Sequence, residues 1–367
     1  MADTSVQFNG WAAKKNWSPE DPLEKWSYNP PKLGPNDVTI AIDYCGICGS
    51  DLHTILPGEK GGWSPKPRSE MDPVIVGHEI VGKVVEVGSQ VKDHKVGDIV
   101  GVGAQARSCM DCEFCTTERK PLCPKTVSTY NAKYHHLPDY KLSSQGGYAD
   151  KIRVHEHWVL PIPKSLDPKV VGPLMCAGIT LYAPLKRHGA GPGKTVGVMG
   201  VGGLGHMGIK WAKAMGCERV VAVSHSDKKK DAATKLGATD YCNFSDEKDV
   251  AQWSAKLDLL VVTSFSNDTN WDAVMGLTKM DGGVTCVVAA PNEAMKHVYA
   301  FSLLTSQRVL TGSLIGDPTL IKEMLEFAAK HNITPDVEIV PMSQANDAVL
   351  KQHEGKARFR YVLDAHA

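Results

Sequence analysis

The chain has 367 residues, of which 42% are hydrophobic and 22% are charged, a composition typical of a globular protein with room for two domains. Its 41 basic and 41 acidic side chains cancel, so the charge balance indicates neither a nucleic-acid nor a membrane-surface partner. The opening MADTSVQFNGWAAKKNW lacks the apolar run of a signal peptide, and no stretch approaches the ~18 apolar residues of a membrane span. We therefore expect a cytoplasmic protein whose ten cysteines stay reduced.

The first part of the chain, up to about residue 170, is rich in Gly, Pro, His and Cys. Short runs such as VTIAIDYC, IVGKVVEVG and GDIVGVGA, separated by turn signals, predict an all-β or barrel-like region. Within it, residues 54–77 hold four prolines and four glycines, which predicts an irregular loop.

Three segments of the chain hold residues of the metal-ligand type: CGICGSDLH (residues 45–53), GHE (77–79) and PLMCAGIT (173–180). Taken singly, each has a simpler explanation. Cys45 and Cys48 could form a redox pair, the histidines could be satisfied within loops, and Cys176 could be a packed core thiol. These residues by themselves do not decide between Cys45 and Cys48 as a ligand.

A short loop, CMDCEFCTTERKPLC, carries Cys109, Cys112, Cys115 and Cys123 at the spacing C-x2-C-x2-C-x7-C. Structural zinc takes four ligands, and thiolate is a preferred one. A site made by this segment alone is closed to substrate, so its role would be to order a loop with little core of its own. An iron–sulfur cluster uses similar gaps, and four buried structural thiols are a third interpretation.

From about residue 176, apolar strand-like runs alternate with helical patterns. The apolar runs predict five strands: TVGVMG, RVVAVS, LDLLVVTSF, VTCVVAAP and RVLTGSLIG. Helical patterns are found in HMGIKWAKAMG and KKDAATKLGA. The alternation predicts a parallel sheet covered on both faces. The tail from about residue 315 holds one helix, TLIKEMLEFAAKHN, and a final strand-like FRYVLD that need not belong to the second domain.

A glycine-rich turn follows the first of these strands, with G-x-G-x-x-G at Gly200, Gly202 and Gly205. Its place between a strand and a helix is the context of a dinucleotide-binding turn. The glycines allow a tight turn, close approach of a pyrophosphate and close packing of helix on strand. The alternative is a glycine-rich turn that binds no ligand.

The end of the next strand predicts which nicotinamide is bound. It ends at Ser224 and is followed by His225, Ser226, Asp227 and lysines up to Lys230, whereas an NAD-preferring site places a carboxylate at the strand end. Hydroxyls and lysines suit a 2′-phosphate, which a carboxylate would repel. We therefore favour NADP(H); the alternative is that the lysines form the solvated start of a helix.

The segments named above occur in an order that resembles the zinc-dependent medium-chain alcohol dehydrogenase superfamily over nearly the whole chain. SQGGYADKIRVHEHWVLPIP and GVMGVGGLGHMGIKWAKAMG resemble its cinnamyl alcohol dehydrogenase branch, most of all the yeast-type NADP-dependent broad-specificity enzymes. The resemblance implies a GroES-like β-barrel catalytic domain with a structural zinc lobe and an α/β Rossmann-type doubly wound parallel sheet domain. We expect these domains at residues 1–175 and 176–314, with residues 315–367 returning to the catalytic domain.

The resemblance also implies two zinc ions. A catalytic zinc would be held by Cys48, His78 and Cys176, with Glu79 beside it, and a structural zinc by the four-cysteine loop. Three ligands leave zinc one position open for an oxygen atom. Two thiolates leave the ion no net charge, so it would polarise a carbonyl without holding an alkoxide irreversibly.

For the remaining roles, the resemblance implies a proton relay through Ser50 and His53, which with Glu79 are the candidate catalytic residues. The expected cofactor-binding residues are Thr180, Gly200, Gly202, Gly203, Leu204, Gly205, Ser224, His225, Lys229, Ser313 and Arg358. At His225 some relatives carry Arg, and Arg360 is a neighbouring candidate for the role of Arg358.

The implied reaction is reversible hydride transfer between NADP(H) and aromatic (cinnamyl-type) or medium-chain alcohols and aldehydes, carried out by a homodimer. Residues 54–77 are longer than the yeast-type pattern, and Trp63 within them is a candidate for shaping the substrate pocket. One alternative is an NAD-dependent polyol or formaldehyde-type dehydrogenase. Another is a catalytically silent, zinc-bearing structural protein of the same fold; a zinc-free quinone reductase is disfavoured, because such chains lack this ligand set.

Overall fold

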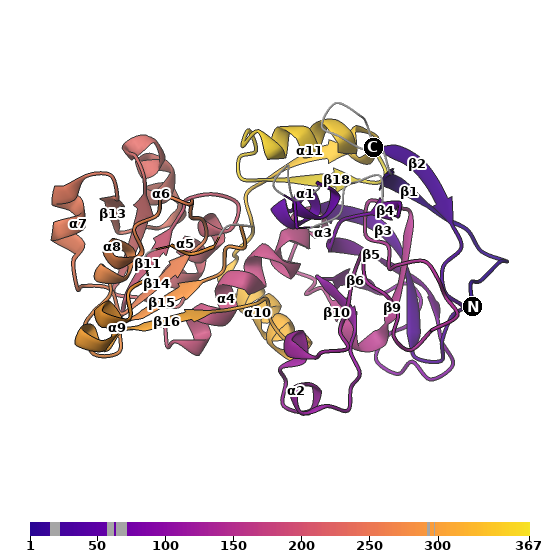
Figure 1. Cartoon of the computed structure of the whole chain (residues 1–367). Helices are drawn as coiled ribbons and strands as arrows, with labels where there is room; N and C mark the ends of the chain where they lie inside the picture. The colour runs from indigo at the N-terminus through magenta and orange to yellow at the C-terminus, as the bar shows by residue number, and fades with distance from the viewer. Residues whose placement is uncertain (15–22, 57–61, 64–71, 292–293, 297) are drawn as a thin grey trace. The chain divides into compact units, whose positions relative to one another are not determined.

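The computed structural model describes residues 1–14, 23–56, 62–63, 72–291, 294–296 and 298–367 (Figure 1). The chain divides into two compact units. Unit 1 comprises Met1–Cys176 and Gly316–Ala367, and unit 2 comprises Ala177–Ile315. The C-terminal segment therefore returns to the unit in which the chain starts.

Unit 1 consists mainly of strands with short helices between them. Its strands are β1 (Phe8–Ala13), β2 (Glu24–Tyr28), β3 (Asp37–Gly46), β4 (Val74–Ile75), β5 (Glu79–Val87), β6 (Ile99–Val102), β7 (Gln105–Arg107), β8 (Val127–Ser128), β9 (Lys151–His155), β10 (Leu160–Pro161), β17 (Val337–Pro341) and β18 (Arg360–Asp364). Its α-helices are α1 (Gly49–Ile55), α2 (Glu113–Thr116), α3 (Pro168–Val171), α10 (Pro318–His331) and α11 (Ala345–His353).

The largest sheet of unit 1 has the order β10-β6-β5-β3-β18-β17, with β9 also paired to β3. In β3 the apolar residues Val38, Ile40 and Ile42 recur at every second position and are buried in the core, as the pleat of a strand requires. β5 and β18 both run antiparallel to β3 and meet its carboxyl end. This end is therefore where segments from three distant parts of the chain come together.

Helix α10 belongs to unit 1 and is fixed at its start by Asp317. The Asp317 carboxylate accepts a hydrogen bond from the Thr319 amide at 3.1 Å, and Pro318 occupies the first helical position. The same carboxylate pairs with the buried ammonium of Lys120 at 3.3 Å. Because Lys120 lies between Cys115 and Cys123, this ion pair ties the four-cysteine loop to the C-terminal segment.

Within the described parts of the chain, no helix is long and apolar enough to cross a membrane.

Unit 2 alternates strands and helices. In chain order these are α4 (Ala177–Arg187), β11 (Thr195–Met199), α5 (Gly205–Ala214), β12 (Arg219–Ser224), α6 (Lys230–Leu236), β13 (Asp240–Asn243), α7 (Glu247–Trp253), β14 (Leu259–Val262), α8 (Trp271–Gly276), β15 (Val284–Val287), α9 (Ala300–Ser306) and β16 (Val309–Gly312). The strand order is β13-β12-β11-β14-β15-β16, and every pair is parallel (Figure 1). This is the order of a doubly wound nucleotide-binding sheet, so the predicted parallel sheet is confirmed.

Candidate functional site

Two groups of Cys, His and acidic side chains in the described residues could hold a metal ion, and the buried one is formed by Cys48, His78, Glu79 and Cys176. The sulfurs of Cys48 and Cys176 lie 3.7 Å apart, although 128 residues separate them in sequence. His78 Nε2 lies 3.1 Å from the Cys176 sulfur. A tetrahedron with metal–sulfur bonds of about 2.3 Å has edges of about 3.8 Å, so the spacing of the two sulfurs fits a zinc ion.

Each ligand candidate stands at the end of an element. Cys48 is the N-cap of α1, His78 directly precedes β5, and Cys176 follows the 3-10 turn Gly172–Met175. The turn approaches β5 so closely that a Cβ atom on Gly172 would lie 2.6 Å from the Glu79 carbonyl oxygen. Glycine is therefore required where the backbone that carries Cys176 packs against the backbone that carries His78.

The structure also separates Cys48 from Cys45. The buried sulfur of Cys45 contacts the Gly46 carbonyl at 3.6 Å, and this residue is outside the metal-ligand group. Burial, with Asp51 and Glu79 nearby, raises its thiol pKa well above the ordinary value. For Cys48 the effect is opposite, because the hydrogen bond with Cys176 and the Arg360 charge outweigh burial and lower the pKa. The Cys48 sulfur is also the one that lies 3.7 Å from the Cys176 sulfur, so the geometry selects Cys48 over Cys45 as the ligand.

Asp51 organises this site, although sequence reasoning did not single it out. Its fully buried carboxylate accepts hydrogen bonds from the Cys48 amide at 2.9 Å and the Gly77 amide at 3.2 Å. It also accepts from the Tyr148 hydroxyl at 2.9 Å and lies 3.2 Å from His78 Nδ1. Burial would lower the pKa of His78, but the Asp51 carboxylate outweighs it and raises that pKa. Asp51 thereby orients the imidazole so that Nε2 faces the sulfurs.

Glu79 is paired with a second residue that the sequence analysis did not assign to this site. Its Oε1 accepts a hydrogen bond from Arg360 at 2.7 Å, whereas its buried Oε2 has no hydrogen-bond partner in the described residues. Burial raises the pKa of Glu79 to about 7, against the Arg360 charge that lowers it. Arg358, which was the predicted cofactor contact, is exposed, and its amide donates to Glu338. Arg360, not Arg358, therefore lies at the buried cluster.

The predicted relay residues Ser50 and His53 both lie on α1, three positions apart, so they share one face of the helix. The Ser50 hydroxyl is 3.7 Å from the Cys48 sulfur. The Trp63 ring stacks on the His53 ring at 5.0 Å with an angle of 15°, and the Trp63 amide donates to the His53 carbonyl at 2.7 Å. Most of the predicted 54–77 loop, residues 57–61 and 64–71, lies outside the described residues.

The second group comprises Cys109, Cys112, Cys115 and Cys123. The sulfur–sulfur distances are 3.8 Å for Cys109–Cys115, 3.6 Å for Cys112–Cys115 and 3.5 Å for Cys123–Cys109, again close to the edges of a zinc tetrahedron. β7 pairs with β8 at the two ends of the loop. Helix α2 lies within the loop (Figure 1). Despite desolvation, hydrogen bonds from the Cys115 backbone and from neighbouring thiols lower the pKa of Cys112 to about 7.

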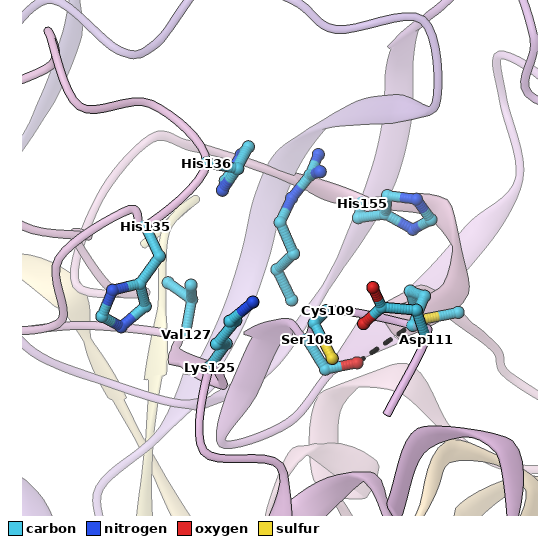
Figure 2. A pocket seen from close by; sticks show the side chains of 10 residues that line it. Ser108, Cys109, Asp111, Lys125, Val127, His135, His136 and His155 are labelled. Atoms are coloured by element: carbon cyan, nitrogen blue, oxygen red, sulfur yellow. Dashed lines mark hydrogen bonds between the residues drawn. The ribbon is translucent and has the colours of Figure 1, made fainter. Parts of the chain in front are cut away.

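A cavity of about 390 Å³ lies beside this loop. Figure 2 shows Lys125, Asp111, His135, His136 and His155 around it, together with Ser108 and Cys109 at the start of the loop. The buried group of Cys48, His78 and Cys176 does not line it. The cavity therefore belongs to the surroundings of the four-cysteine loop.

In unit 2 the predicted turn has the geometry of a dinucleotide-binding turn. Gly200 has a φ of +94°, and a Cβ on Gly205 would lie 1.7 Å from the Gly200 carbonyl oxygen, so both positions require glycine. Nothing lies within 4 Å of the Cβ position of Gly202, which leaves space for a ligand. Gly203 and Leu204 complete the turn, and α5 starts at Gly205, so the positive end of the helix dipole lies at the turn, where it would favour a phosphate.

The other predicted cofactor residues of unit 2 lie as follows. Ser224 ends β12 and is followed by exposed His225 and Lys229. Ser313 directly follows β16, and its buried hydroxyl has no hydrogen-bond partner among the described residues. Carboxyl ends of parallel strands meet at one edge of a sheet, so Ser224 and Ser313 lie along the same edge as the glycine turn. Thr180 is buried within α4.

Comparison with known proteins decides the family. Residues 34–164 match the family described as Alcohol dehydrogenase GroES-like domain, and residues 203–330 match Zinc-binding dehydrogenase. Aldehyde reductase YahK of Escherichia coli is 40% identical over 349 residues, covering 95% of this chain and 96% of that protein. The chain belongs to the zinc-dependent medium-chain alcohol dehydrogenases. It is accordingly an oxidoreductase of the class that acts on CH–OH donors.

Solved structures of cinnamyl alcohol dehydrogenases agree. A cinnamyl alcohol dehydrogenase from Sorghum bicolor has a TM-score of 0.90 at 35% identity, covering 99% of this chain and 98% of that one. The cinnamyl alcohol dehydrogenase of Helicobacter pylori, solved with NADP(H), has a TM-score of 0.85 at 34% identity, covering 98% and 99%. The predicted family, its GroES-like and Rossmann-type fold and its zinc chemistry are confirmed, which decides against an iron–sulfur cluster.

Proposed function

We propose that this dehydrogenase interconverts aldehydes and alcohols with NADP(H), using zinc held by Cys48, His78 and Cys176. A second, structural zinc is assigned to the four-cysteine loop. The observation that carries the proposal is the convergence of two sulfurs and one imidazole from distant segments at tetrahedral spacing. Three protein ligands are the set that catalytic zinc uses, because one position must remain for the reacting oxygen.

The protein's own residues prepare this chemistry before any ligand binds. When bound, zinc supplies Lewis acidity at a carbonyl oxygen, and the nicotinamide supplies the hydride. Asp51 holds His78 so that Nε2 faces the metal position. Arg360 keeps the Glu79 carboxylate beside the sulfurs, which makes Glu79 available as an additional oxygen donor.

A proton must leave the alcohol hydroxyl during oxidation, and α1 supplies two groups for it. The Ser50 hydroxyl beside Cys48 can accept that proton and pass on its own, and the His53 imidazole on the same face of the helix can receive it. This role is supported by their shared helix face.

The preference for NADP(H) is supported by the end of β12. Ser224 stands where NAD-preferring sheets carry a carboxylate, and Lys229 offers a positive charge to a 2′-phosphate. Asp227 is the nearest acid in sequence, and it is engaged by the side-chain amide of Asn243 at 3.4 Å. The relative from Helicobacter pylori was solved with NADP(H).

Aromatic and medium-chain aldehydes are the proposed substrate class. The Trp63 ring is 43% exposed and lies against His53. An exposed indole face beside the relay would favour flat apolar substrates over polyols, because it offers apolar area and no polar partner for several hydroxyl groups. The relatives named for cinnamyl alcohols agree with this choice.

We also propose a homodimer that pairs the edge strand β16. Among the described strands, β16 has β15 on one side and no partner on the other. The neighbouring Phe301, Leu304 and Leu314 are 74%, 72% and 60% exposed, an apolar surface that an isolated protein would not favour.

A cytoplasmic location is supported by the absence of disulfides from all ten cysteines.

A turnover screen with both coenzymes tests the proposal. Protein containing two zinc ions per chain is given aromatic aldehydes, medium-chain aldehydes and polyols, each with NADPH or NADH. We expect aromatic aldehydes to be reduced with NADPH at least about tenfold more efficiently than with NADH, as a 2′-phosphate contact of roughly 1.4 kcal/mol implies. Polyol oxidation with NAD would favour the polyol alternative, and no turnover by fully metallated protein would favour a structural protein.

A further inference from the structure

Tyr130 makes a contact at the buried metal group that the proposed mechanism does not use. Its side chain is buried, and its hydroxyl lies 3.1 Å from His78 Nδ1. The two rings are 5.4 Å apart at an angle of 47°. The phenol also interacts with Asp51 and Thr54. Tyr130 therefore borders His78 on the side opposite to the metal position.

His78 Nδ1 has one proton to share between two acceptors when Nε2 faces the metal. Asp51 Oδ1 lies at 3.2 Å and the Tyr130 hydroxyl at 3.1 Å. A carboxylate can only accept, whereas a phenol can accept from Nδ1 and donate its own proton to Asp51. The imidazole, phenol and carboxylate thus close a ring of hydrogen bonds. With Asp51 as its only partner at Nδ1, the His78 imidazole could tilt about that single contact. The Tyr130 hydroxyl adds a second contact to the same nitrogen atom.

The backbone of Tyr130 is set by the strands that close the four-cysteine loop. β8 pairs with β7, and β8 ends two residues before Tyr130. Thr129, between them, is tied on both sides, because its amide donates to the Ala104 carbonyl at 3.0 Å and its hydroxyl to the Gly103 carbonyl. β7 ends two residues before Cys109, and β8 begins four residues after Cys123. The β7–β8 pair therefore connects the loop to the segment that carries Tyr130.

We propose that Tyr130 is a positioning residue for His78, through which the four-cysteine loop controls how firmly the buried site retains its metal. The proposal rests on the assignment of Cys48, His78 and Cys176 as zinc ligands. It gives the loop a second role besides its own stability. Loss of a hydrogen-bonding partner behind a ligating histidine commonly weakens metal binding by about 10- to 100-fold.

Metal release from the full-length, fully metallated protein tests this directly. Tyr130→Phe removes only the hydroxyl and keeps the ring. Tyr140→Phe is the matched control, because Tyr140 is also a buried tyrosine whose hydroxyl donates a hydrogen bond, 2.9 Å to the Asn29 carbonyl, and it belongs to neither metal group. With a chelator in excess and no coenzyme or substrate, we expect Tyr130→Phe to release the buried ion about tenfold faster than the unmodified protein. Tyr140→Phe should not change the rate.

Cobalt substitution adds a readout independent of activity. Cobalt bound by two thiolates and an imidazole absorbs differently from cobalt bound by four thiolates, so the two sites can be followed separately. Tyr130→Phe should shift the spectrum of the buried site and leave that of the loop unchanged. Equal release rates and equal spectra for Tyr130→Phe and Tyr140→Phe would overturn the proposal. A protein that passes these tests and turns over no alcohol would contradict the proposed function alone.

The link to the loop is tested by a double-mutant cycle. Cys112→Ser removes a half-buried loop ligand and should accelerate release from the buried site in the unmodified background. In the Tyr130→Phe background, Cys112→Ser should accelerate metal release by a smaller factor, because the hydroxyl contact through which the loop acts on His78 is already absent. Equal factors in both backgrounds would show that the loop does not act through Tyr130. If Cys112→Ser does not fold, the same cycle is run with Ser108→Ala, which removes the Ser108 hydroxyl that lies 3.3 Å from the Cys115 sulfur.

Discussion

The four-cysteine loop and the buried group of Cys48, His78 and Cys176 differ in how the chain brings their ligands together. The loop takes all four from fifteen consecutive residues, and two of its sulfurs are only half buried. The buried group draws on segments that meet only because β3, β5 and a 3-10 turn pack together. The fold therefore prepares the buried site before metal binds, whereas the loop depends on its metal for order. Loss of metal should abolish activity at the first site and reduce stability at the second.

The largest expected effect is the loss of catalysis when the buried site loses a ligand. Cys176→Ser should lower kcat/KM by roughly a thousandfold, because Lewis-acid stabilisation is worth about 4 kcal/mol. Metal analysis should find one ion per chain in place of two, with the unfolding midpoint little changed. A variant that keeps two ions and normal turnover would remove Cys176 from the site.

The next largest effect is expected on stability, when the buried ion pair between Glu79 and Arg360 is broken. Arg360→Met leaves the Glu79 carboxylate buried without its partner and should lower the free energy of unfolding by about 3–5 kcal/mol. Urea unfolding measures the loss. The double variant Glu79→Gln with Arg360→Met removes both charges and should recover much of it. If the double variant is no more stable than the single one, the pairing does not explain the loss.

The loop is tested by Cys112→Ser. We expect the free energy of unfolding to fall by about 3 kcal/mol and Tm to fall by at least roughly 6 °C, because a structural metal contributes to folding. Turnover per folded molecule should fall far less than in Cys176→Ser. Calorimetry and active-site titration separate the two quantities. An equal loss of turnover in both variants would contradict the division of roles between the sites.

A smaller effect is expected from the relay. His53→Gln should slow alcohol oxidation by about tenfold below neutral pH and less above it, since hydroxide in the solvent then accepts the proton. The pH–rate profile is measured with His53→Gln and with the exposed control His353→Gln. Profiles of identical shape for the two variants would leave His53 without a role in proton transfer.

The smallest effect is expected in unit 2, at the ion pair of Arg219 and Asp240, which belongs to neither metal group. The Arg219 hydrogen bond lowers the pKa of Asp240 below its ordinary 3.8. The charged form therefore stabilises the fold above pH 3.8, and this contribution is lost as the pH falls through the lowered pKa. Asp240→Asn should cost less than about 1 kcal/mol at pH 7 because the pair is partly exposed, and nothing in strong acid. A cost that is independent of pH would indicate a packing effect instead.

The two metal groups also show what can be predicted from sequence. The loop could be found from spacing, because ligand order along the chain determines its geometry. The parallel sheet and the turn at Gly200 were likewise visible as periodicity and glycine pattern. The buried group required a family resemblance, since no local rule places residue 176 beside residue 48. Asp51 and Tyr130 were missed, and Arg360 was considered only for cofactor binding and not for its pairing with Glu79, because these roles arise only from packing. The one signal was an acid three residues after Cys48, at the start of a helix.

The most direct test of the account is a crystal structure of the protein as purified, with anomalous scattering recorded on both sides of the zinc absorption edge. We expect two peaks per chain. One lies between the sulfurs of Cys48 and Cys176 and Nε2 of His78, and the other lies among the four sulfurs of the loop. A single peak in the loop, with the buried side chains arranged around no metal, would contradict it.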